Sequence, residues 1–210
     1  MTDLHDRLRS VPRPTPALSR DRERALTTRQ REILDELTKV VDDGFADLTM
    51  AELAARVRCS LRTLYELAPS RDELVLVVVD RNLWRVGRTA ANALDEDMAP
   101  LDAIRAYLRA ATVAVAGTTP AFARDLAAVP AAQRLNDAHS DYLVAVTRCL
   151  LDLAVERGDI ADVDTGAVAR VMAGLGRDFA RAEVISTLRS SPKDAADAVV
   201  DVILRGLRVA

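Results

Sequence analysis

Apolar side chains recur along most of this chain with the three- to four-residue spacing of amphipathic helices. The first stripe lies between Thr27 and Gly44. Its apolar members are Ile33, Leu34, Leu37, Val40 and Val41. Thr27 followed three residues later by Gln30 is a capping-box pattern, which marks a helix start, and a glycine commonly follows a helix end. The pattern therefore predicts a helix of about four turns between Thr27 and Gly44.

Two short helices are predicted next. Thr49 and Glu52 form a second capping box and open a helix of about nine residues. That helix ends before Ser60, which is itself a favourable N-cap and opens a third helix. The third helix stops near Leu67, because Pro69 cannot continue it. The inner faces of both helices, expected to pack against the first helix, consist of Leu53, Ala54, Val57, Leu64 and Leu67.

The rest of the chain also follows a helical pattern. Ser70 and Glu73 form a third capping box, which opens a long fourth helix reaching to about Leu94. The apolar run at 74–79 would also suit a buried strand, but no partner strand is apparent in the sequence, so a helix is favoured. Five further stripes begin at Ile104, Phe122, Leu135, Val168 and Ala196. Nine helices and no strand predict an all-α fold.

Three segments of the chain differ in character. Residues 1–26 hold three prolines among Arg, Ser and Asp, without a sustained apolar period, which predicts a flexible N-terminal arm. Residues 27–73 hold the first three helices, and residues 74–210 are expected to form a larger helical domain. Half of the residues are hydrophobic but only 3% are aromatic, so the core must be built mainly from Ala, Val and Leu.

Charge is unevenly distributed along the chain. The net charge is −3, which argues against a protein coated in nucleic acid. Residues 1–31, however, carry eight Arg against four acidic residues. A local basic cluster is what contact with phosphates requires, although a solvated, disordered tail explains the charges of residues 1–24 equally well.

Several classes of protein are not expected. Cys59 and Cys149 are far apart and lack metal-ligand spacing, so we predict no metal site, no cofactor and no disulfide framework. The sequence shows no signal-peptide pattern, and its longest apolar run is too short to cross a membrane, so we expect a cytoplasmic protein without membrane contact. His5 and His139 are the two histidines, and no GxSxG, HExxH, P-loop or GxGxxG motif occurs. An enzyme is therefore not expected.

The two short helices match the architecture of a helix-turn-helix, although their spacing alone also fits an ordinary helical hairpin. The segment 29–74 resembles the DNA-binding region of the TetR family of transcriptional regulators without a gap. The positions that carry this resemblance are Ile33-Leu34, Gly44-Phe45, Thr49-Met50-Ala51-Glu52-Leu53-Ala54, Ser60, Thr63-Leu64-Tyr65 and Pro69-Ser70-Arg71-Asp72-Glu73-Leu74. The Thr-Leu-Tyr and Ser-Arg-Asp triplets are its specific part.

Four positions depart from the family pattern. Arg58 stands in the turn where the family usually has Gly, so a positive φ there would be strained. Leu61 replaces a Lys that often begins the recognition helix, which removes one phosphate contact. Ala68 and Val41 each stand where a Phe is common. These changes put the base contacts in doubt rather than the fold.

The third helix is predicted to read DNA with its N-terminal side chains. Arg62 can bond guanine bidentately, and Thr63 can meet a thymine methyl or a phosphate. The resemblance implies that Tyr65 also contacts DNA, with a packing role as the alternative. It further implies phosphate contacts from the first, second and fourth helices, although the arginine of the fourth helix is equally explained as a solvated charge. The predicted DNA-binding residues are Arg29, Thr49, Ser60, Leu61, Arg62, Thr63, Tyr65 and Arg71.

The resemblance also implies a mechanism. A family member of this kind binds a palindromic DNA operator as a homodimer, usually as a repressor, and a small-molecule effector in the domain of residues 74–210 releases it by moving the fourth helix. The scarcity of aromatic residues suggests an apolar effector. The predicted effector-binding residues are Trp84, Tyr107, Phe122, Tyr142, Met172 and Phe179. The predicted dimer-interface residues are Val168, Met172, Leu175, Val199, Val200, Ile203 and Leu207.

One alternative to an operator-binding regulator stays open at this point. Arg58, Leu61 and Glu66 make the reading surface unusual. A TetR-like fold that has lost operator binding and acts as a protein-interaction partner would also fit these residues.

Overall fold

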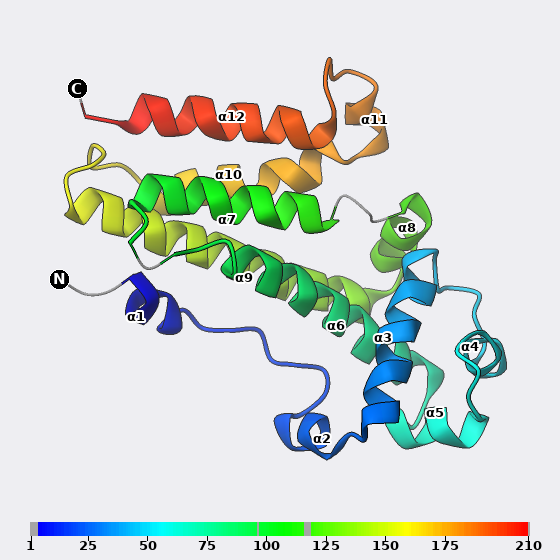
Figure 1. Cartoon of the computed structure of the whole chain (residues 1–210). Helices are drawn as coiled ribbons and strands as arrows, with labels where there is room; N and C mark the ends of the chain where they lie inside the picture. Colours follow the sequence, from blue (N-terminus) through cyan, green and yellow to red (C-terminus); the bar gives the residue numbers. More distant parts are fainter. Residues whose placement is uncertain (1–3, 96, 116–118, 210) are drawn as a thin grey trace. The chain divides into compact units, whose positions relative to one another are not determined.

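The computed structural model describes residues 4–95, 97–115 and 119–209, and within them the chain is helical (Figure 1). All nine predicted helices are present, and the all-α fold class is confirmed. The helices are α1 (Leu4–Arg9), α2 (Arg20–Ala25), α3 (Thr28–Asp42), α4 (Met50–Arg56), α5 (Leu61–Leu67), α6 (Arg71–Ala91), α7 (Pro100–Val115), α8 (Pro120–Ala128), α9 (Pro130–Glu156), α10 (Thr165–Phe179), α11 (Ala182–Ile185) and α12 (Pro192–Leu207). Extended pairing within the described residues is limited to one isolated bridge between Ile160 and Arg208.

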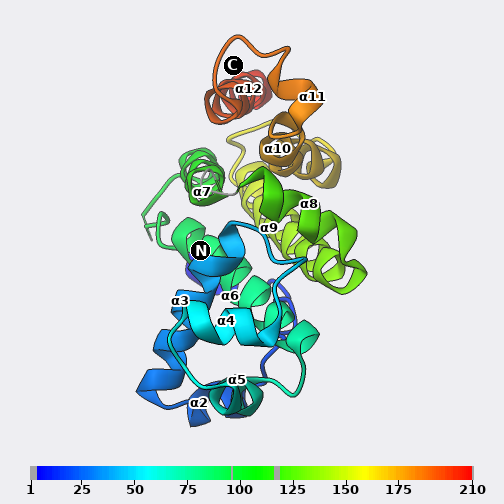
Figure 2. The ribbon, with the colours of Figure 1, turned by 90° about the vertical axis from the view of Figure 1, so that its right-hand side faces the viewer.

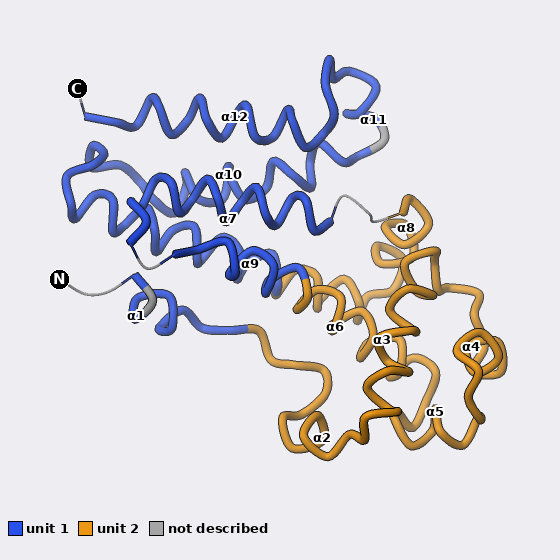
Figure 3. The backbone as a smooth tube through the Cα atoms, viewed as in Figure 1, with its two compact units in different colours: residues 1–13, 86–117, 139–210 blue, residues 14–85, 118–138 orange. Residues whose placement is uncertain are grey.

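The chain divides into two compact units (Figure 3). Unit 1 consists of residues 1–13, 86–117 and 139–210, and unit 2 of residues 14–85 and 118–138. The division falls inside α6 and inside α9, so each of these helices contributes to both units. The domain boundaries expected from sequence were contiguous, whereas each compact unit is assembled from separated segments.

Unit 2 is built around α3, whose apolar residues Ile33, Leu34, Leu37 and Val41 are buried. Leu34, Leu37 and Leu64 each have no exposed surface, and they belong to one core with residues of α4, α5 and α6. Both predicted capping boxes on α3 and α4 are formed: the Thr27 hydroxyl accepts from the Gln30 N–H at 3.2 Å, and the Thr49 hydroxyl accepts from the Glu52 N–H at 3.2 Å. These caps fix where the two helices begin.

The segment expected to be a flexible arm contains two helices, α1 and α2. The structure buries Leu4 and Val11 in the core of unit 1 and Leu18 in the core of unit 2. On α2, the Arg22 guanidinium donates to the Leu67 carbonyl at 3.1 Å, at the C-terminal end of α5. A cation at that position satisfies a carbonyl that the helix itself leaves unpaired. These contacts are long-range, so local composition did not reveal them.

Unit 1 is a stack of longer helices. Helix α12 lies alongside α10 and α7, and Figure 2 shows these helices end-on with α9 next to them. The core is aliphatic, as the composition predicted, and is supplied mainly by α7, α9, α10 and α12. Its fully buried members include Ile104, Leu150, Leu151, Ala169 and Met172. None of the described helices combines the length and the apolar character needed to span a membrane.

Gly44 ends α3 in a conformation that only glycine adopts readily, and we predict that Gly44→Ala destabilises the protein. Its φ is +108°, and an added Cβ would lie 3.2 Å from both the Ala121 Cβ and an Asp125 carboxylate oxygen. The expected loss is about 1–3 kcal/mol of unfolding free energy. The matched control is Gly87→Ala inside α6, where a Cβ meets nothing within 4 Å. That change should raise stability by about 0.5–1 kcal/mol, so thermal melts must shift in opposite directions.

Candidate nucleic-acid interface

Helices α4 and α5 form a helix-turn-helix whose turn covers residues 57–60 (Figures 1 and 2). The Cys59 N–H donates to the Ala54 carbonyl at 3.0 Å and the Arg58 N–H to the Ala55 carbonyl at 3.3 Å. This pair of bonds is the Schellman pattern, which places one residue in the left-handed region. Arg58 is that residue, with a φ of 51°, and it is the one non-glycine with positive φ among the described residues. The turn therefore has the positive φ for which the family pattern usually supplies Gly.

We predict that Arg58→Gly stabilises the protein. A non-glycine residue pays about 1–2 kcal/mol in the left-handed region, and the greater freedom of unfolded glycine offsets about 0.5–1 kcal/mol of the gain. The expected net rise in unfolding free energy is about 0.5–1 kcal/mol, which denaturant titration would measure. Arg58→Val is the opposite control, because a β-branched residue tolerates positive φ poorly and should lower stability.

Helix α5 turns one side to the core and the other to solvent. The Ser60 hydroxyl accepts from the Thr63 N–H at 3.1 Å, so Ser60 caps α5 as predicted. Leu64 and Leu67 are buried at 0% and 2% exposure, whereas Leu61 and Tyr65 are 45% and 53% exposed. The outward side chains at its N-terminal end are the ones that a major-groove reader needs.

Arg62 is the one cationic residue of α5. Its side chain is 89% exposed, and its Nε contacts a Glu66 carboxylate oxygen at 3.2 Å. A surface pair one helical turn apart is worth only about 0.3–0.5 kcal/mol. Arg62 can therefore leave Glu66 for a guanine edge at little cost.

The starts of α3 and α4 already carry carboxylates. Glu52 Oε2 accepts from the Thr49 N–H at 2.8 Å and from its hydroxyl at 2.7 Å. The backbone bond from Thr49, followed by the bond from its hydroxyl, lowers the pKa of Glu52. Arg29 is exposed and paired with Glu32 at 3.2 Å and Glu36 at 3.5 Å. Phosphate contact by Thr49 or Arg29 would thus require these carboxylates to be displaced.

Arg71, predicted either to contact phosphate or to be a solvated charge, binds backbone carbonyls of this protein. Its side chain is only 25% exposed. The guanidinium donates to the Leu48 carbonyl at 2.8 Å, to the Ala46 carbonyl at 2.6 Å and to the Phe45 carbonyl. Arg71 is thus engaged with the backbone that connects α3 to α4, and its phosphate contact stays a prediction.

The six predicted effector-binding residues do not share one unit. Phe122 lies in the core of unit 2, where its ring meets Phe45 edge-on at 5.8 Å, so it is a core residue rather than a free pocket wall. Trp84 also lies in unit 2. Tyr107 and Tyr142 are neighbours in unit 1, where burial, and then Tyr142, raise the pKa of Tyr107. The other two predicted residues, Met172 and Phe179, lie on α10 of unit 1.

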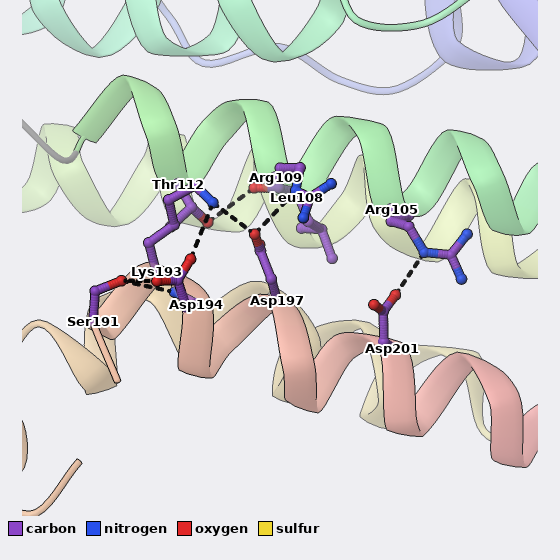
Figure 4. Close-up of polar contacts among 9 residues, drawn as sticks. All are labelled: Arg105, Leu108, Arg109, Thr112, Ser191, Lys193, Asp194, Asp197 and Asp201. Atoms are coloured by element: carbon purple, nitrogen blue, oxygen red, sulfur yellow. Dashed lines mark hydrogen bonds and ion pairs between the residues drawn. The ribbon is translucent and has the colours of Figure 1, made fainter. Parts of the chain in front are cut away.

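A small hollow between α7 and α12 is bordered by charged side chains that pair with one another (Figure 4). The Arg105 Nε donates to Asp201 at 2.6 Å, and the Arg109 Nε donates to Asp197 at 3.0 Å. Lys193 donates to the same Asp197 oxygen at 2.9 Å. These pairs hold α12 against α7 and leave little charge for a ligand.

The predicted dimer residues separate into two groups. Met172 and Val200 are buried in the protomer's own core at 2% and 5% exposure, so their side chains do not form a surface. The remaining five, which are half-buried on α10 and α12, are Val168, Leu175, Val199, Ile203 and Leu207. Val171 and Val202, which the predicted set does not include, are 56% and 60% exposed on the same two helices. Val171 stands directly before buried Met172 in the same apolar run, whereas Val202 lies two positions after buried Val200.

Comparison with known proteins gives a fold-level match. The sequence matches no protein-family model and none of the curated proteins. A TetR transcription regulator from Haloarcula marismortui superposes with a TM-score of 0.74 over 88% of this chain and 100% of that chain, at 17% identity. A TetR-like regulator from Rhodococcus sp. RHA1 has a TM-score of 0.61 over 90% and 97%, at 23% identity. PfmR, a TetR family transcriptional regulator from Thermus thermophilus, superposes with a TM-score of 0.59 over 84% of this chain and 99% of that chain, at 22% identity. The chain therefore has the TetR-family fold.

Proposed function

We propose that this protein is a TetR-family transcriptional regulator that binds a palindromic operator as a homodimer and acts as a repressor released by a small-molecule effector. The observation that carries the proposal is α5, which is anchored by buried Leu64 and Leu67 and presents Leu61, Arg62 and Tyr65 to solvent. Its helix-turn-helix belongs to a fold that TetR-family transcriptional regulators share.

The proposed DNA contacts centre on the N-terminal half of α5. Arg62 is assigned to a guanine edge, while Ser60 and Thr63 are placed to meet phosphate or a thymine methyl. Leu61 and Tyr65 add apolar and hydroxyl contact on the same exposed side. Outside α5, the proposed phosphate contacts are Arg29 and Thr49, each after release of its neighbouring carboxylate.

The proposed dimer interface is formed by α10 and α12. These helices pack against each other and carry exposed Val171 and Val202 beside half-buried apolar residues. Apolar surface of this kind is a common mark of a protein–protein contact. Two copies would place two α5 helices on DNA, and their half-sites must lie one helical turn, roughly 34 Å, or a multiple of it apart.

The effector is proposed to bind in the helical part of unit 1. Tyr107 and Tyr142 supply a neighbouring pair of aromatic side chains in an otherwise aliphatic core. Such surroundings favour an apolar molecule with a polar group that a phenol can bond.

A second candidate function is a protein of this fold that acts through another protein. It is favoured by the carboxylates on the reading surface, where Glu66 pairs with Arg62 and Glu52 covers the start of α4. Both acids oppose a phosphate backbone, whereas Leu61 suits a protein surface.

Selection from a random pool of double-stranded DNA separates the two candidates. The repressor proposal predicts enrichment of an inverted repeat with half-site centres about 10–10.5 base pairs, or a multiple of that, apart. An unenriched pool, both in low salt and near physiological salt, would contradict it and favour the protein-interaction candidate.

A further inference from the structure

The end of α3 lacks a bond that the ends of α4 and α9 possess. At the end of α4 the Cys59 N–H donates to the Ala54 carbonyl at 3.0 Å, and at the end of α9 the Asp159 N–H donates to the Ala154 carbonyl at 2.9 Å. The N–H at the corresponding position, three residues after the last residue of α3, belongs to Phe45. It donates instead to the Asp125 Oδ2, on α8, at 2.6 Å. The end of α3 is therefore completed by a side chain from another helix.

Helix α8 holds this backbone through several contacts. Asp125, only 5% exposed, accepts a second bond on Oδ2 from the Ala46 N–H at 2.8 Å. Burial acts to raise the pKa of Asp125, but the N–H groups of Ala46 and Phe45 and the neighbouring Arg124 outweigh it, so the pKa lies below its ordinary value. The Thr119 hydroxyl donates to the Asp42 carbonyl at 2.5 Å. The carboxylate is thus held ionised by the groups that it binds.

Arg71 holds the carbonyl side of the same peptides. Asp125 takes the N–H groups of residues 45 and 46, and the Arg71 guanidinium takes the carbonyl groups of residues 45, 46 and 48. Gly44 allows Asp125 to approach this backbone. Its φ of +108° is readily adopted by glycine, and an added Cβ would lie 3.2 Å from the Asp125 Oδ2. The Asp125 carboxylate of α8 therefore binds the N–H groups of the α3–α4 connection, and the Arg71 guanidinium of α6 binds its carbonyl groups.

We propose that Asp125 and Arg71 are positioning residues for DNA binding, which hold the α3–α4 connection and thereby fix the position of the start of α4 relative to α3. Thr49, the cap of α4, directly follows this connection. The inference rests on the proposed function for its DNA part. It links α8 to the helix-turn-helix of α4 and α5, and it makes Arg71 act through the α3–α4 connection rather than on phosphate. A displacement of α8 or of the start of α6 would reach α4 through these bonds.

Amide hydrogen exchange in the DNA-free protein tests whether Asp125 holds the N–H groups of Phe45 and Ala46. Asp125→Ala is expected to accelerate exchange at Phe45 and Ala46 by about tenfold or more, because both N–H groups lose a charged acceptor. Asp125→Asn, which keeps an accepting oxygen, should restore most of the protection. Asp137→Ala, an exposed carboxylate on α9 of the same unit, is the control. Unchanged exchange at residues 45 and 46 in a folded Asp125→Ala protein would overturn the proposal, whatever the protein does with DNA.

The salt dependence of DNA affinity tests the role of Arg71. The probe is the duplex immediately upstream of the protein's own gene. Arg71→Met should weaken binding about tenfold or more while leaving the slope of log K against log salt unchanged, and Arg71→Lys should not restore affinity, because one ammonium cannot span three carbonyls. A slope smaller by about 0.9 would instead identify a lost phosphate contact and overturn the assignment. If the wild-type protein binds no DNA, the proposed function fails. The exchange result then still shows whether Asp125 holds the α3–α4 connection.

Discussion

Leu64→Ala is expected to lower the free energy of unfolding by about 2–5 kcal/mol. Leu64 has no exposed surface and joins α5 to the core of unit 2. Removing three carbons there loses their burial and leaves a cavity that a seven-residue helix cannot close easily. Denaturant titration followed by circular dichroism would measure the change, with the midpoint falling and the slope staying constant.

The control for this substitution lies on the same helix. Leu61 is 45% exposed, so Leu61→Ala should change stability by less than about 0.5 kcal/mol. Equal losses at the two positions would contradict the assignment of α5 as a helix with one buried and one free side.

Arg62→Ala is expected to weaken binding to the cognate DNA by about 1–3 kcal/mol, which is about 5- to 150-fold in Kd. The Arg62 side chain is 89% exposed at the start of α5 and is held only by the surface pair with Glu66. Arg62→Lys keeps the charge but cannot form the bidentate bond to guanine. We therefore expect Arg62→Lys to lose discrimination between sequences while retaining most of the affinity for unrelated DNA.

Arg157→Ala serves as the charge-matched control. Arg157 is exposed at the end of α9 in unit 1, outside the proposed interface. Competition titrations with cognate and unrelated duplexes would measure each variant. A loss in Arg62→Ala that is the same for both duplexes would show a phosphate contact rather than base reading.

Helix positions could be predicted from the sequence because the signals are local. Thr27 with Gln30 and Thr49 with Glu52 place a hydroxyl and its partner three residues apart, and both capping boxes are formed. The family pattern also pointed to a positive φ at Arg58, and the residue has a φ of 51°. Each of these features depends on residues within one or two turns of the chain.

The features that sequence did not predict depend on distant partners. Asp125 accepts from Phe45 across 80 positions, and the order of polar residues along the chain does not indicate such a bond. The partners of Arg71 are also distant in sequence. Its motif predicted a phosphate contact, and its guanidinium donates to carbonyls 23 to 26 positions earlier. Helices α1 and α2 were missed because each is only six residues long and neither carries a stripe of apolar residues; Leu4 of α1 is buried by distant segments, and α2 has no buried residue.

The surface of α10 and α12 shows the limit of periodicity. An apolar stripe predicts which helix face is buried, but it does not say whether a core or a partner buries it. Met172 belongs to the core, whereas Val171, directly before it in the chain, faces solvent. A single step along a helix turns a side chain by about 100°, which is enough to exchange the two roles.

The central claim is that this protein reads a DNA sequence, and a fluorescence-anisotropy titration tests it most directly. The labelled duplex is the DNA immediately upstream of its own gene, with a scrambled duplex of equal composition as the control. We predict binding to the upstream duplex at least about 1,000-fold tighter than to the scrambled one, with affinity falling steeply between about 50 and 200 mM salt. Equal affinity for the two duplexes, or no binding to either, would contradict the account.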